Sequence, residues 1–147
     1  MKHYALLLAA ASLAVPGMAS AKSTPLDIEQ LHYETVHDAA RRGIIAVDGQ
    51  GRPLTFLLRI AKGQFLPPHG ATGPIRLLTV ISGTLSWGDG NKVDPAAERT
   101  FGPGSIIVVP AQGGEHWAAA RQDDVLLQAV LVHDGALAPE VAAQAVP

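Results

Sequence analysis

Apolar residues in this chain fall mostly into short runs that glycine, proline and polar residues separate. The clearest runs are at positions 44–47, 54–61, 77–81, 105–109 and 125–132. They are rich in Val, Ile and Leu and too short for typical helices, which favours strands. Turn-forming sequences such as Asp48-Gly-Gln-Gly51 and Gly102-Pro-Gly104 stand between them. The pattern predicts about eight to ten short strands, as in a β-sandwich or β-barrel.

One stretch, residues 63–83, joins two of the predicted strands through a corner rich in proline and glycine. It contains a single histidine, His69, and shortly after it a single arginine, Arg76. The apolar residues around 77–81 lie between the turn formers Gly73-Pro74 and Ser82-Gly83. We therefore expect the function to depend on what His69 and Arg76 face.

The first 21 residues have the features of a secretory signal peptide. A short basic start precedes an apolar run at positions 5–15 that is too short for a permanent membrane span, and Ala19-Ser-Ala21 is a suitable cleavage site. We expect cleavage before Lys22 and a periplasmic or secreted protein. An uncleaved membrane anchor is the alternative.

Charge and cysteine content narrow the partners. The chain has 11 basic and 13 acidic residues, and its only basic pair is Arg41-Arg42. Nucleic acid is therefore not an expected partner, nor is a membrane surface once the signal is cleaved. Without a cysteine, the chain cannot form disulfides.

The predicted organisation is a signal peptide at 1–21, an N-terminal arm at 22–40, one barrel domain at 41–135 and a C-terminal tail at 136–147. Within the arm, we expect extended structure around 31–36 and a turn near 38–43. The tail is rich in alanine and favours one or two helical turns. His32, His37 and His133 lie outside any motif, so we expect them to be solvated or in loops.

Two spaced segments resemble the two motifs of the cupin superfamily. The first runs from Gly63 to Gly83, with His69, Ala71 and Arg76 between them. The family motif has glycine, His-x-His, glutamate and glycine at this spacing.

The second segment runs from Gly104 through Pro110 to His116-Trp117, with one residue more than usual between proline and histidine. The resemblance covers roughly residues 54–132 and implies an all-β, single-domain antiparallel jelly-roll barrel with a ligand cavity. It also implies that positions 69 and 71 share one face of a strand.

This chain departs from the motif at two of the four ligand positions that metal-binding cupins use. His69 and His116 are retained, but Ala71 replaces the second histidine and Arg76 replaces the glutamate. A divalent ion needs about three protein ligands, and an arginine would repel it. We therefore expect no bound metal. If one is held, His69 and His116 would bind iron, zinc, manganese or nickel, with Gln128 or Glu115 as a third ligand.

The preferred interpretation is an exported cupin that binds a small polar or anionic molecule in the barrel, without a metal. The expected ligand-binding residues are His69, Arg76, His116 and Gln128, the last being the only polar residue within 125–132. Arginine offers a planar fork to an anion, and histidine offers donors or acid–base chemistry. Arg76 paired with Glu115 in a purely structural role is an alternative.

Two other functions stay open. The chain could be an enzyme: either a metal-dependent dioxygenase or isomerase with substitute ligands, or a metal-free isomerase or lyase using His69 and His116. It could instead be a structural protein with a filled barrel that acts through dimerisation. The sequence assigns no catalytic residue and leaves turnover, ligand identity and a homodimer undecided.

Overall fold

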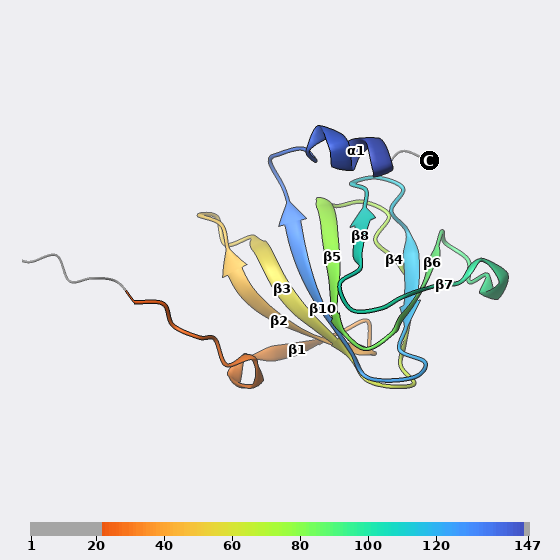
Figure 1. The fold of residues 1–147 in the computed structure, drawn as a ribbon, viewed down its shortest axis with the longest axis horizontal. Coiled ribbons are helices and arrows are strands. Elements are labelled where there is room, and N and C mark those ends of the chain that lie inside the picture. The colour runs from red at the N-terminus through yellow and green to blue at the C-terminus, as the bar shows by residue number, and fades with distance from the viewer. Residues whose placement is uncertain (1–21, 146–147) are drawn as a thin grey trace, which may run out of the picture.

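The computed structural model describes residues 22–145, which form two antiparallel sheets (Figure 1). The strands are β1 (Tyr33–Val36), β2 (Ala40–Val47), β3 (Pro53–Ile60), β4 (Phe65–His69), β5 (Ile75–Ser82), β6 (Leu85–Asp89), β7 (Arg99–Phe101), β8 (Ile106–Val109), β9 (His116–Ala119) and β10 (Val125–Val132). The six-stranded sheet has the order β1-β2-β3-β10-β5-β8, and the four-stranded sheet has the order β4-β9-β6-β7. The all-β jelly-roll prediction is confirmed. The predicted signal peptide at 1–21 lies outside the described residues.

The core lies between the sheets and is built by alternating side chains. In β10, Val125, Leu127 and Ala129 are buried against the opposite sheet. Trp87 and Leu66 approach them from the four-stranded sheet. Alternation places every second residue of a strand on one face, so the residues between these belong to the outer face of the larger sheet.

The N-terminal hairpin extends the larger sheet further than the sequence predicts. The expected turn near 38–43 is shorter, because β2 already begins at Ala40, which pairs with Val36 of β1. The tight turn uses His37 and Asp38, which both have a φ of 53°. Pairing of β2 with β3 holds the polar start of β2 in an extended conformation. The segment assigned to an arm thus supplies a strand of the sheet.

Within residues 22–145, three short helical elements accompany the strands. They are η1 (Ile28–Gln30), η2 (Pro95–Ala97) and α1 (Pro139–Ala145). Figure 1 shows α1 at one end of the barrel, where Val141 shares a hollow with the residues of β8. In the part of the chain that the structure describes, we find no helix with the length and apolar character to span a membrane.

Candidate functional site

The two motif histidines come from neighbouring strands of the smaller sheet. His69 ends β4 and His116 begins β9, and the register of the two strands pairs them directly. Their ring centroids lie 4.3 Å apart. The histidines of the two motifs, which are far apart in sequence, are therefore adjacent in the fold.

Backbone carbonyls set the tautomer of both imidazoles. The Nδ1 of His69 lies 2.7 Å from the carbonyl oxygen of Pro67, and that of His116 lies 2.7 Å from the oxygen of Gly114. A carbonyl can only accept, so each Nδ1 carries the hydrogen and donates it. Each Nε2 is thereby left as the acceptor of the neutral ring.

His116 is the more enclosed of the two residues, with only 4% of its surface exposed. Its ring stacks on Trp87 at a centroid distance of 4.1 Å and an interplanar angle of 11°. Burial lowers the pKa of His116 to about 4, and the nearby His69 and Arg76 lower it further. The imidazole of His116 is therefore neutral at pH 7.

Arg76 completes the group from the larger sheet. Its Nη2 donates to the carbonyl oxygen of Gly70 over 3.0 Å, while its buried Nε has no hydrogen-bond partner. A Cβ added at Gly70 would lie 2.8 Å from Nη1 of Arg76 and 3.2 Å from Cε1 of His116. The guanidinium and the His116 ring thus meet over the backbone of Gly70. Burial lowers the pKa of Arg76, and burial with the nearby positive charges lowers that of His69.

Position 71 does not share a strand face with His69, contrary to the expectation. β4 ends at His69, and Gly70 has a φ of 82°, which breaks the alternation of side chains. Ala71 follows in the corner and is exposed. Glycine at 70 allows the turn and leaves room for the arginine, because a Cβ there would collide with the guanidinium.

His69 and Arg76 line a hollow of about 250 Å³ at the mouth of the barrel. The apolar part of its wall consists of Val36, Phe56, Leu58, Leu66, Pro74 and Leu131. Its charged or ionisable lining residues are His37, Arg42, His69 and Arg76, and no acidic residue is among the described residues that line it. The hollow therefore combines a cationic rim with an apolar wall.

His37 is a residue of this rim that the sequence analysis assigned to a loop. Its ring centroid lies 4.2 Å from that of His69, so His69 contacts the imidazole of His37 as well as that of His116. The tight β1–β2 turn carries His37 over the mouth, and its left-handed backbone is uncommon for a residue with a Cβ. Sequence offers no signal for this contact, because it depends on how the hairpin packs against β4.

Two other expected residues lie elsewhere. Gln128 donates to Oγ1 of Thr55 over 3.4 Å and lies on the strand face opposite to the buried Leu127 and Ala129, so the structure does not bring it to His69. Glu115 lines a separate hollow with Asp89 and Arg99. The ion pairs of the described residues do not join Glu115 to Arg76.

The residues at the mouth do not fit a divalent metal ion. Within residues 22–145, no three histidine, cysteine, aspartate or glutamate side chains gather in a way that could hold one. His69 contacts both His37 and His116, and the carboxylate position of the motif is taken by the guanidinium of Arg76. The positive charge of Arg76 would repel a metal ion held at these imidazoles, and such repulsion amounts to kilocalories per mole at low dielectric.

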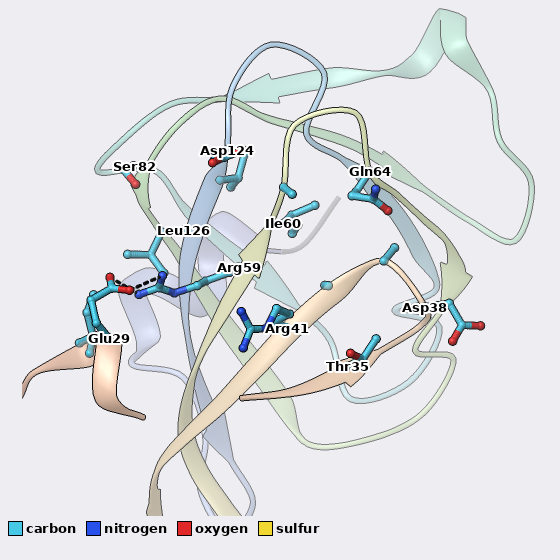
Figure 2. Close-up of a pocket in the computed structure, with 15 residues that line it drawn as sticks. Glu29, Thr35, Asp38, Arg41, Arg59, Ile60, Gln64, Ser82, Asp124 and Leu126 are labelled. Atoms are coloured by element: carbon cyan, nitrogen blue, oxygen red, sulfur yellow. Dashed lines mark hydrogen bonds and ion pairs between the residues drawn. The ribbon is translucent and has the colours of Figure 1, made fainter. Parts of the chain in front are cut away.

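A second hollow, of about 600 Å³, lies where the segment around η1 and the β1–β2 hairpin face strand β3 (Figure 2). Arg41 and Arg59 line it together with the acidic residues Glu29, Asp38 and Asp124. Figure 2 shows Glu29 bonded to Arg59, and the two shortest contacts are 2.6 and 3.0 Å. Because its charges are of both signs and partly paired, this hollow offers no clear preference for an anion.

Solved structures with a similar fold support the architecture. The chain is similar to a predicted oxalate decarboxylase from Thermotoga maritima (TM-score 0.58, 11% identity, 74% of this chain and 98% of that chain). It is also similar to a Cupin 2 conserved barrel domain protein from Salinispora arenicola (TM-score 0.54, 16% identity, 79% and 92%). At these identities the likeness shows the fold alone.

A chain in the crystal structure of Rhodobacter sphaeroides SigE in complex with the anti-sigma ChrR is similar over a shorter part of its length (TM-score 0.54, 26% identity). That match covers 71% of the present chain but only 50% of the other. No protein-family model and no curated protein sequence matches the chain. The proteins that share this architecture are named for different functions. The function of this chain must therefore be inferred from its site and not from its fold.

Proposed function

The chain is a cupin-fold protein, and on that premise we propose that it binds a small polar or anionic molecule at the barrel mouth without a metal ion. Arg76 would hold the negatively charged group of the ligand. His69 would contact its other polar atoms, and His116, which does not line the hollow, would support His69 from behind. Gln128 is not part of this proposal, because its amide bonds to Thr55 on the outer face.

The observation that carries the proposal is a half-buried arginine without an acidic partner. Each of five other arginines pairs with a carboxylate in the described part of the chain: Arg42, Arg52, Arg59, Arg99 and Arg121. Arg76 has one carbonyl partner and a buried Nε that bonds to nothing. An unpaired buried cation is costly, and a bound anion would offset that cost.

The neutral imidazoles support the same interpretation. With Nδ1 committed to a carbonyl, the Nε2 of His69 can accept a hydrogen bond from a hydroxyl group of the ligand. A bound anion would also offset the positive charge of Arg76, which now disfavours protonation of His69. The group can thus adapt to either a polar or an acidic ligand.

Metal-free isomerase or lyase chemistry is the second candidate. The observation that favours it is a pair of neutral imidazoles beside a guanidinium, because a base next to a bound carboxylate could take up a proton. A base works best when its pKa is close to the ambient pH. The pKa of about 4 for His116 is low for that role, so we place binding ahead of turnover.

Intrinsic fluorescence and elemental analysis test the proposal directly. Trp87 stacks on His116, so an anion that alters the charge of this imidazole should change the emission of the protein. We expect saturable changes on titration with acetate or inorganic phosphate in wild type, and a loss of affinity of about tenfold or more in Arg76→Gln. Arg41→Gln is the matched control, because Arg41 is exposed and lines the other hollow. One tightly held equivalent of iron, zinc, manganese or nickel in the purified protein would rule out the metal-free site.

Export and assembly are separate proposals. We propose that residues 1–21 are removed and that the mature chain works in the periplasm or outside the cell. Expression of the full chain in a bacterial host should give a periplasmic protein whose N-terminal residue is Lys22, as read by intact mass. A homodimer would be recognised by light scattering on the same sample.

A further inference from the structure

We propose that the ligand is a small amphipathic monocarboxylate, with its carboxylate on Arg76 and its hydrocarbon part along the apolar wall of the mouth. This inference rests on the proposed function and names the class of ligand that the same site takes. The inference concerns every part of the hollow, whereas the proposed function concerns only the negatively charged group of the ligand.

The register of the larger sheet places the two halves of the site side by side. Leu131 of β10 pairs directly with Arg76 of β5, and Ala129 of β10 pairs with Phe56 of β3. The apolar wall therefore begins on the strand next to the guanidinium and continues across β10 to β3. A ligand with its carboxylate at Arg76 would have its hydrocarbon part directed over Leu131 and Phe56.

The charge of the rim favours a single negative group. Arg42 also lines the hollow, but its guanidinium bonds to Glu34, with contacts of 2.5 and 3.0 Å. Arg76 is thus the lining arginine whose charge no carboxylate in the described chain offsets. A second acidic group on the ligand would find a guanidinium that already has a partner.

The size and chemistry of the wall narrow the rest of the ligand. A hollow of about 250 Å³ is smaller than the roughly 300–1,000 Å³ of pockets for drug-sized molecules. A sugar or polyol would place hydroxyl groups against Phe56, Leu58 and Leu131, which offer them no hydrogen bond. A short aliphatic or aromatic tail would instead gain from leaving water.

A series of straight-chain acids tests the class, with the tryptophan signal as readout. We expect affinity to rise about fourfold per methylene from acetate through butanoate to hexanoate, until the hollow is filled. Hexan-1-ol should bind at least about tenfold more weakly than hexanoate, because it lacks the charge. Inorganic phosphate should compete with acetate but not match hexanoate.

Two variants separate the head from the tail. Arg76→Gln should weaken hexanoate by about tenfold or more. Leu131→Thr should weaken hexanoate much more than acetate and so reduce the rise along the series, because it removes part of the apolar wall beside Arg76. Arg41→Gln should change neither result. Unchanged thermal unfolding of each variant confirms that the fold is retained.

The outcomes distinguish the two proposals. Equal affinity for acetate, phosphate and hexanoate would overturn the amphipathic class and leave anion binding in place. Hexan-1-ol binding as tightly as hexanoate would overturn the role of the charge. If no acid and no phosphate binds, the proposed function itself fails.

Discussion

Two arginines of this barrel each have a buried Nε without a hydrogen-bond partner, yet their terminal nitrogens lie in opposite surroundings. Arg59, on β3, donates two hydrogen bonds to the carboxylate of Glu29 and lies 4.8 Å from the centroid of the Tyr33 ring. Arg76, on β5, donates one to the carbonyl of Gly70. Arg59 joins the N-terminal segment to the barrel, while Arg76 brings a charge into the mouth that its own chain does not balance.

The electrostatic consequences have opposite signs. The hydrogen bonds that Arg59 donates to the carboxylate of Glu29 raise the pKa of Arg59 and lower that of Glu29, so both groups hold their charges more firmly. Burial lowers the pKa of Arg76 and of both motif histidines, so these groups hold their charges less firmly. Groups whose charged form is disfavoured in a hollow are candidates for ligand contacts, because a ligand of opposite charge can stabilise that form.

The largest expected effect comes from reversing the charge at the mouth. Arg76→Glu removes the repelling cation and adds a carboxylate to the pair of imidazoles, which makes three ligands. We expect this variant to bind Zn²⁺ at least about a hundredfold more tightly than wild type. Competition with a chelating dye and elemental analysis after dialysis measure it.

Arg59→Glu is the matched control, because it makes the same change of charge at the other arginine. We expect it to leave zinc affinity at the wild-type level. If Arg76→Glu bound no more zinc than this control, Arg76 would not be the reason that the site disfavours a metal.

The pH dependence of stability should come from the mouth and not from the ion pair at Arg59. The pKa of His116 falls from 6.5 to about 4 on folding, so between these values the unfolded chain binds the additional proton. The contribution of neutral His116 to the free energy of unfolding is fully present above about pH 6.5 and is lost as the pH drops towards 4. The expected loss is about 3 kcal/mol by urea unfolding, since each pKa unit corresponds to ~1.4 kcal/mol.

His116→Gln should flatten this slope, whereas His32→Gln, which removes an exposed imidazole, should preserve it. The pKa of Asp48 is lowered from 3.8 to about 2, so its contribution is lost only below this window. An identical slope in wild type and His116→Gln would contradict a buried neutral imidazole. A bound carboxylate should make the loss of unfolding free energy at low pH smaller, because it favours the protonated ring.

These contrasts show which parts of the molecule could be predicted from sequence. β10 lies at residues 125–132 as predicted, because an unbroken run of apolar residues between polar turns leaves little alternative. The start of β2 was missed, because Ala40-Arg-Arg-Gly43 has no apolar pattern and is held extended by its pairing with β1 and β3. Local composition fails where neighbouring strands decide the conformation.

The site divides in the same way. His69, Arg76 and His116 were found through the spacing of two motifs, and the structure brings them together. Gln128 was selected because it is the only polar residue of its strand, but residues on both faces of β10 are apolar, so sequence could not assign its face. His37 reaches His69 across 32 positions of sequence through the hairpin turn, which no motif records.

The smallest expected effect is a difference in stability between two neutral replacements, Arg59→Met and Arg76→Met. Arg59→Met removes a half-exposed ion pair and a contact with the Tyr33 ring, and it frees the segment that holds Glu29. Exposed ion pairs and cation–π contacts contribute only fractions of a kcal/mol each, so the free energy of unfolding should fall by about 1 kcal/mol.

Arg76→Met loses the bond to Gly70 but also removes a buried charge without an acidic partner, and methionine keeps a comparable apolar stem. In ligand-free protein we therefore expect its stability to stay at or above that of wild type, as is common when a binding residue is replaced. Urea unfolding at pH 7 measures both variants, and faster amide exchange at Ile28–Gln30 should accompany Arg59→Met alone. If Arg76→Met were the more destabilised of the two, Arg76 would be a structural residue of the barrel, and the case for a ligand at its guanidinium would be lost.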